Sequence, residues 1–197
     1  HTVDYKKIGL ETYGKPGNYV ARQVSRWTKQ YLASETETIP EMDNLIEWLA
    51  DNIPDDDETS IVHGDYRLDN MIYKNHEVIG VLDWELSTLG HPIADFSYHC
   101  LTWRTLPAMS DLKLIKELGI PSEVEYRDMY SEYTGKDLSK NWEFYMVFNM
   151  FKIAAILQGI LGRVRDGTAS SKHAEERGMQ VFPISKAAWN IVETNFK

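Results

Sequence analysis

The sequence predicts a mainly helical α+β protein that carries a small β insert. Apolar residues recur at helical spacing on both sides of the insert, whereas residues 60–82 form short β-rich runs. The chain has 197 residues, 43% of them hydrophobic, which is enough to bury one sizeable core. We therefore expect one globular domain over residues 1–197.

Helical periodicity dominates the first fifty residues. Apolar side chains recur at roughly helical spacing over residues 18–33, and residues 42–49 repeat the pattern more cleanly. Pro54 and the acidic run Asp55–Glu58 then interrupt it. For the acidic run we favour a solvated loop over a metal site.

The β insert consists of the three runs Ser60–Val62, Met71–Tyr73 and Val78–Leu82. The last two are joined by the short connection Lys74–Glu77, which indicates a hairpin. Everything after Pro92 has helical character again.

Three features define the helical part after Pro92. Ser122 and Glu125 have the spacing of a capping box. Residues 142–165 predict a long helix with an aromatic stripe, which we interpret as core rather than as a cofactor site. A final helix is expected over about residues 185–196.

Composition and charge exclude several classes of partner. The net charge of −9 and pI near 5.1 argue against nucleic acid or an anionic membrane surface as a partner.

Cys100 is the single cysteine, so an internal disulfide is excluded and a reducing cytoplasmic location is expected. We recognise no apolar run of transmembrane length. Residues 1–7 contain neither a signal-peptide core nor a start methionine, so we expect a piece of a longer chain.

Polar residues gather where the short strands end. Asp65 and Asn70 follow the first strand, separated by five positions, and Asp83 ends the hairpin. This is the kinase layout of a catalytic Asp, a metal-binding Asn and a metal-binding Asp. Phosphoryl transfer needs a carboxylate to accept the proton of the attacking hydroxyl, and hard oxygen ligands that hold Mg²⁺ against the phosphates of ATP.

The motif Val62-His63-Gly64-Asp65 with Asn70, followed by Leu82-Asp83-Trp84-Glu85, resembles the H-G-D-x-x-x-x-N and D-x-[DE] signatures of aminoglycoside phosphotransferases and choline kinases. A wider match covers most of the chain and resembles the kinase-like modules fused to, or encoded beside, acyl-CoA dehydrogenases (family members ten and eleven). Its segments are Gly17–Tyr19, Arg22-Gln23, Trp27–Tyr31, Arg67–Asn70, Leu82–Gly90 and Gln158-Gly159.

This resemblance implies a two-lobed protein-kinase-like fold, of which the chain would form the larger, C-terminal lobe. The nucleotide-gripping N-terminal lobe would be absent, and the fragment alone would be inactive. The implied substrates are ATP and a small hydroxyl-bearing molecule, a hydroxyacyl-CoA or hydroxy acid rather than an antibiotic. An acyl-CoA dehydrogenase domain or protein is the implied partner.

The motifs also lead us to expect that the smaller lobe is absent from this chain. No G-x-G-x-x-G loop and no V-A-I-K-like lysine precede Asp65. Residues 9–15 spell G-x-x-x-x-G-K, but Pro16 replaces the Ser or Thr that would bind Mg²⁺. We interpret this segment as a turn.

Four residues beside the core trio have candidate roles. Arg67 either neutralises the transferring phosphoryl group or pairs with Asp69 or Asp95. Glu85 is a candidate for a second metal or its water. The resemblance implies that the His63 imidazole hydrogen-bonds the backbone near Asp83; the alternative is that His63 acts directly as an acid or base. It also implies that Asp95 is a buried acid at the start of a helix, where it supports the catalytic loop.

Two other functions compete with a kinase: a catalytically silent kinase-like binding module, and a metal-dependent hydrolase. The hydrolase would be assembled from His63, Asp65, Asp83, Asp95 and His99. A further cationic set could bind an acidic substrate, although we favour a role in complementing a helix dipole: Lys152, Arg163 and Arg165.

Overall fold

The computed structural model describes residues 1–196, apart from the side chains of Ala108 and Ser110. The fold is mostly helical with small antiparallel sheets, which confirms the predicted class. The chain forms two compact units. Residues 1–19 and 56–142 make the first, and residues 20–55 and 143–196 belong to the second.

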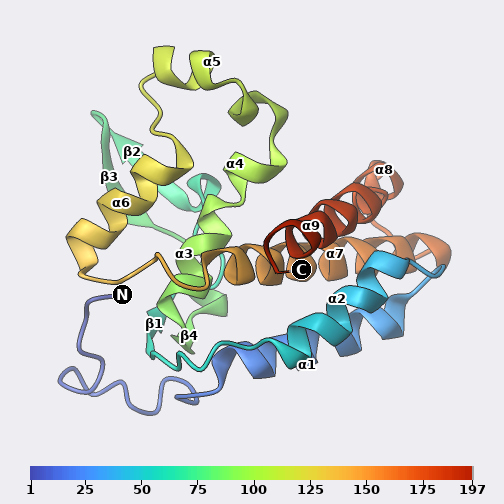
Figure 1. The fold of residues 1–197 in the computed structure, drawn as a ribbon, viewed down its shortest axis with the longest axis horizontal. Helices are drawn as coiled ribbons and strands as arrows, with labels where there is room; N and C mark the ends of the chain where they lie inside the picture. The colour runs from blue at the N-terminus through green and yellow to red at the C-terminus, as the bar shows by residue number, and fades with distance from the viewer. Residues whose placement is uncertain (197) are drawn as a thin grey trace. The chain divides into compact units, whose positions relative to one another are not determined.

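Within residues 1–196, all the strands lie in the first unit. They form two separate two-stranded antiparallel sheets (Figure 1), of which one pairs β1 (Ser60–Val62) with β4 (Thr88–Gly90) and the other is the hairpin of β2 (Met71–Lys74) and β3 (Glu77–Val81). The predicted hairpin is confirmed. Its two-residue turn has Asn75 and His76 at φ 52° and 67°, as expected of a type I′ turn.

The other regular elements of the first unit are short helices. The 3-10 helices are η1 (Leu68–Asn70), η2 (Trp84–Leu86) and η3 (Pro107–Ser110), and the α-helices are α3 (Pro92–Cys100), α4 (Thr102–Thr105), α5 (Leu112–Glu117) and α6 (Glu123–Thr134). The predicted capping box of Ser122 and Glu125 is confirmed at the start of α6. Phe96 on α3 stacks on Tyr130 on α6, with ring centroids 3.8 Å apart.

The acidic run is a loop, but its charges are not simply solvated. Asp56 pairs with the buried His91 at 3.4 Å, and Asp57 accepts a 2.7 Å hydrogen bond from the backbone of Asn18. Glu58 forms an ion pair with Lys136. These contacts tie three distant segments together, so the loop has a structural role that its composition did not reveal.

The second unit is built from helices, namely α1 (Tyr19–Ser34), α2 (Pro40–Asp51), α7 (Trp142–Arg165), α8 (Ala174–Gly178) and α9 (Val181–Asn195). Residues 1–18 lie outside any helix, so the mostly helical start is correct only from Tyr19 onward. Buried Gln158 on α7 donates to the Ser34 carbonyl at the end of α1. The long helix 142–165 is confirmed, and the last helix begins four residues earlier than expected, at Val181.

Helix α7 corrects the statement that no apolar run reaches transmembrane length. By length and composition alone it could cross a membrane, yet 72% of its most apolar window is buried inside the protein. Its aromatic residues Phe144, Phe148 and Phe151 are almost fully buried. Both observations are what a core helix shows, as the sequence predicted for the aromatic stripe.

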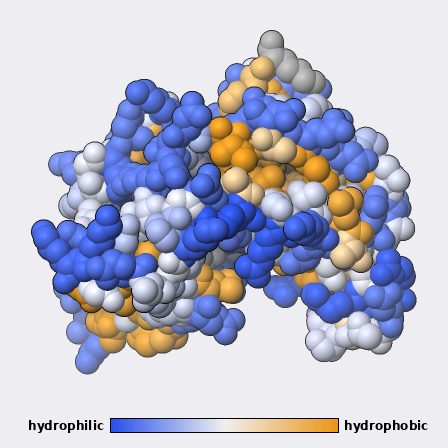
Figure 2. All heavy atoms as spheres, turned by 90° about the horizontal axis from the view of Figure 1, so that it is seen from below, coloured by the Kyte–Doolittle hydropathy of each residue, from blue (hydrophilic) through white to orange (hydrophobic). Residues whose placement is uncertain are grey.

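Outside the core, apolar side chains reach the surface in patches among hydrophilic ones (Figure 2).

Candidate active site

The segment that carries the predicted catalytic residues, His63–Asn70, is here called the catalytic segment; it follows strand β1 and is bonded by helix α3. The buried Asp95, in the first turn of α3, accepts hydrogen bonds from the backbone N–H groups of His63 and Gly64, both at 2.8 Å. Gly64 has φ 85°, and a Cβ there would lie 2.7 Å from the Leu86 carbonyl oxygen. The turn therefore requires glycine and is held by a carboxylate, as expected for Asp95.

Both ring nitrogens of His63 bind backbone groups. Nδ1 accepts the N–H of Asp65 at 3.2 Å, so Nε2 carries the proton and donates to the Leu82 carbonyl at 2.8 Å. The ring also lies 4.7 Å from that of Trp84. His63 thus joins the segment carrying Asp65 to the one carrying Asp83. This is the expected backbone contact, and it leaves neither nitrogen for acid–base chemistry.

Asp65 is the most heavily bonded of the predicted catalytic residues. Its Oδ1 accepts from the Tyr98 hydroxyl at 2.8 Å. Its Oδ2 accepts from Asn70 Nδ2 at 3.0 Å and lies 3.2 Å from Arg67 Nε. With its side chain 17% exposed, the carboxylate keeps access to solvent while donors fix its orientation.

The hairpin brings Asn70 and Asp83 to the same end. Asn70 precedes β2, and its carbonyl accepts the N–H of Leu82, just after β3, at 2.8 Å. Asp83 follows in the left-handed region at φ 63°, which few non-glycine residues adopt. This conformation lies in the exposed segment between β3 and η2.

The donor chemistry at this end suits Mg²⁺. Asn70 uses Nδ2 for both of its bonds to Asp65, which leaves the amide oxygen as a ligand. Asp83 and Glu85 are exposed carboxylates. Amide and carboxylate oxygens are the hard ligands that Mg²⁺ prefers, so these residues fit the ion.

Arg67 is about half exposed and pairs with acids of its own segment. Its Nε lies near Asp65, and Nη1 lies 3.6 Å from Asp69 Oδ2. The predicted pairing with Asp69 is therefore present. Because the guanidinium is exposed, it also remains accessible to a phosphoryl group.

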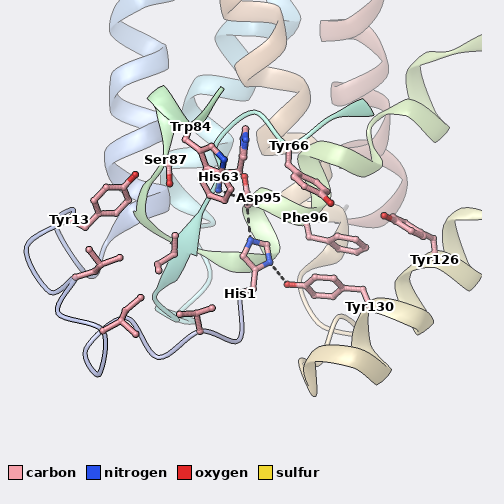
Figure 3. A pocket seen from close by; sticks show the side chains of 14 residues that line it. His1, Tyr13, His63, Tyr66, Trp84, Ser87, Asp95, Phe96, Tyr126 and Tyr130 are labelled. Carbon is pink, nitrogen blue, oxygen red and sulfur yellow. Dashed lines mark hydrogen bonds and ion pairs between the residues drawn. The ribbon is translucent and has the colours of Figure 1, made fainter. Parts of the chain in front are cut away.

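A cavity of about 760 Å³ lies beside the catalytic segment (Figure 3). The imidazole of His1 spans it, bonding Asp95 Oδ2 at 3.1 Å and the Tyr130 hydroxyl at 2.6 Å. The lining is mainly apolar and aromatic and consists of His1, Val3, Ile8, Leu10, Tyr13, Ile61, His63, Tyr66, Trp84, Ser87, Asp95, Phe96, Tyr126 and Tyr130.

Sequence reasoning missed Tyr98 and His1. Tyr98 lies three residues after Asp95, one helical turn along α3, and this spacing was the available signal. His1 gave no signal, because its contacts with Asp95 and Tyr130 span 94 and 129 residues.

The hydrolase alternative finds no support in the geometry. Within residues 1–196 as described, no group of three or more His, Cys, Asp or Glu side chains is arranged to hold a metal ion. Nδ1 of His99 lies 3.2 Å from the Tyr66 carbonyl, and burial lowers the pKa of this histidine. The half-buried His99 is therefore held by contacts with the backbone and ring of Tyr66.

The cations of α7 belong to the second unit. Arg165 donates to the Glu35 carbonyl and pairs with Asp166, each at 2.8 Å. The ammonium of Lys152 lies 5.9 Å from the centre of the Trp27 ring. Arg163 lies beside Gly159 on the same helix, because a Cβ at position 159 would lie 3.9 Å from a guanidinium nitrogen of Arg163. Arg165 and Lys152 therefore have partners within the second unit. Arg163 and Arg165 lie in the last turn of α7, where a cation complements the helix dipole, whereas Lys152 lies in the middle of the helix and does not fit that interpretation.

Comparison with known proteins identifies the family. A model of the phosphotransferase enzyme family (APH) matches residues 1–130. The chain belongs to this family. A crystal structure from Ralstonia eutropha, described as a candidate aminoglycoside phosphotransferase, is 52% identical with a TM-score of 0.93; the match covers 98% of this chain and 61% of that one. The kinase-like fold is thereby confirmed.

Curated relatives of this phosphotransferase family member are acyl-CoA dehydrogenase proteins. Acyl-CoA dehydrogenase family member 10 of Mus musculus is 44% identical over 198 residues, and family member 11 of Rattus norvegicus is 42% identical over 199. Each match covers 97% of this chain but only 18% and 26% of the respective relative. The predicted resemblance is confirmed, and the chain spans about a fifth to a quarter of these relatives.

Proposed function

We propose that this chain is the catalytic part of an ATP- and Mg²⁺-dependent kinase that phosphorylates a hydroxyl group of a small molecule. The observation that carries the proposal is the hydrogen bond from Asn70 to Asp65 at the hairpin end where Asp83 follows. It brings a candidate base next to a candidate metal ligand, as phosphoryl transfer requires. Family membership supports this class of reaction.

Asp65 would act on the acceptor. Its carboxylate orients the attacking hydroxyl and accepts its proton, while donors on both oxygens hold it in place. Arg67, two residues later and half exposed, would neutralise charge on the transferring phosphoryl group. His63 and Asp95 would support the segment through backbone hydrogen bonds.

Asn70 and Asp83 would hold Mg²⁺, with Glu85 reaching a second ion or its water. Mg²⁺ supplies charge neutralisation at the nucleotide phosphates when it is bound. The left-handed backbone at Asp83 and the bond between Leu82 and Asn70 set the two ligands at one end of the hairpin.

For the acceptor we propose a hydroxyacyl thioester or a hydroxy acid. The aromatic side chains of α3 and α6 that line the cavity favour an acceptor with an apolar part. Polycationic aminoglycosides would instead favour acidic walls. The dehydrogenase names of the relatives also support an acyl substrate.

The nucleotide would be gripped by a further lobe. The Ralstonia structure is longer than the part matched here, as are the dehydrogenase relatives. We propose that such a lobe supplies the phosphate-binding loop and lysine, and that a dehydrogenase domain or protein is a partner of the whole assembly.

Phosphate transfer by the full-length protein tests the function. With Mg-ATP, we expect transfer to hydroxyacyl-CoAs above transfer to choline-like alcohols and aminoglycosides, and loss of transfer in Asp65→Asn. Mg-ATP binding without transfer to any acceptor would favour the silent module. Preferred transfer to an aminoglycoside would retain the kinase and overturn the proposed acceptor.

A further inference from the structure

Two of the side chains through which helix α3 contacts the catalytic segment lie one turn apart, Asp95 and Tyr98. Asp95 bonds the backbone of His63 and Gly64, and Tyr98, three residues later, donates its hydroxyl hydrogen to Asp65 Oδ1 at 2.8 Å. One helix therefore holds both the backbone of the turn and the carboxylate that the turn presents.

Tyr98 donates to Oδ1 of Asp65, whereas the other two donors, Asn70 and Arg67, contact Oδ2. Of those two, Arg67 is half exposed, and Asn70 is also proposed to bind the metal. The pKa of the Tyr98 phenol is raised well above its usual range, mainly by burial and to a lesser extent by the hydrogen bond to Asp65. The phenol consequently stays protonated and can only donate to the carboxylate.

We propose that Tyr98 is a positioning residue for phosphoryl transfer, which holds the Asp65 carboxylate in the orientation that receives the acceptor hydroxyl. This inference rests on the proposed function, in which Asp65 acts on the acceptor. A carboxylate bonded at both oxygens cannot rotate about its Cβ–Cγ bond without losing a donor. Since this chemistry depends mainly on positioning, losing one donor should slow turnover.

The test is Tyr98→Phe in the full-length protein. The change keeps the ring and removes the hydroxyl, so the fold should persist, as measured by melting temperature. We expect kcat to fall about tenfold or more, while KM for Mg-ATP stays within about twofold. The matched control is Tyr31→Phe, which alters a buried tyrosine on α1 outside the catalytic segment and should leave kcat unchanged.

A double-mutant cycle separates this inference from the proposed function. If Tyr98 acts through Asp65, adding Tyr98→Phe to Asp65→Asn should change kcat by less than about twofold. An unchanged kcat in Tyr98→Phe alone, or the same loss in both backgrounds, overturns the positioning role while Asp65 keeps its own. Full turnover in Asp65→Asn would instead overturn the role of Asp65, and that of Tyr98 with it.

Discussion

The Asn70 side chain donates two hydrogen bonds to Asp65 from one nitrogen, to the main-chain carbonyl at 2.9 Å and to Oδ2 at 3.0 Å. The two bonds close the chain from Asp65 to Asn70 into a compact loop. They also orient the Asn70 amide, so its oxygen points away from Asp65 and remains available as a ligand for a metal ion. The acceptor side and the metal side of the proposed chemistry thus share one contact.

Replacing Asp65 by Asn should lower turnover of the full-length protein by about 10² or more. The amide has the shape of the carboxylate but cannot accept the acceptor's proton. Because this side chain acts on the acceptor rather than on ATP, nucleotide affinity should be nearly intact. Steady-state kinetics with a nucleotide-binding titration would check this, and an unchanged turnover number would sink the assignment.

Asp83→Asn should instead weaken Mg²⁺-dependent ATP binding and turnover together, since it removes a charged metal ligand. The control is Glu77→Gln, which neutralises an exposed acid at the other end of the same hairpin. ATP affinity would be titrated against Mg²⁺ concentration for both variants. Survival of the normal metal dependence in Asp83→Asn would reassign Asp83 as a structural residue.

Local patterns made much of the fold predictable. The hairpin followed from two β-rich runs around a short connection, and the capping box followed from Ser122 and Glu125 alone. These features depend on residues close in sequence. The hairpin also carried Asn70 and Asp83 to one end, which is why their spacing indicated a site.

Long-range contacts were not predictable in the same way. Strand β4 (Thr88–Gly90) has only three residues, one of them glycine, and gains its strand character by pairing with Ser60–Val62. The contact between Asp56 and His91 and the ion pair between Glu58 and Lys136 depend on tertiary structure as well. A one-dimensional pattern shows that such residues are polar but does not show what they meet.

Gly64→Ala should destabilise the protein more than Gly119→Ala. Both glycines have positive φ, at 85° and 69°, so each substitution carries a backbone cost of about 1 kcal/mol. Only at Gly64 would the new Cβ meet backbone, 2.7 Å from the Leu86 carbonyl oxygen, whereas nothing lies within 4 Å at Gly119. Denaturant unfolding would measure both, and equal losses would contradict a tight turn at Gly64.

The pH dependence of stability should include a contribution from His99. Burial lowers its pKa in the folded state, outweighing the hydrogen bond to the Tyr66 carbonyl and the Asp95 carboxylate, which act in the opposite direction. Above the unfolded value of about 6.5, both states are neutral and the group costs nothing. As the pH falls below that value, the unfolded chain takes up a proton that the folded chain resists, so stability is lost.

We therefore expect wild type to lose stability relative to His99→Gln between about pH 7.5 and 5.5, by at most about 1.4 kcal/mol per pH unit. Denaturant unfolding at several pH values would give the difference in free energy of unfolding. His173→Gln is the control, because this side chain is 64% exposed. Taking the difference from wild type removes the titration of groups that both proteins share. A difference for His99→Gln that stays constant with pH would show that His99 takes up its proton equally well in the folded and unfolded states.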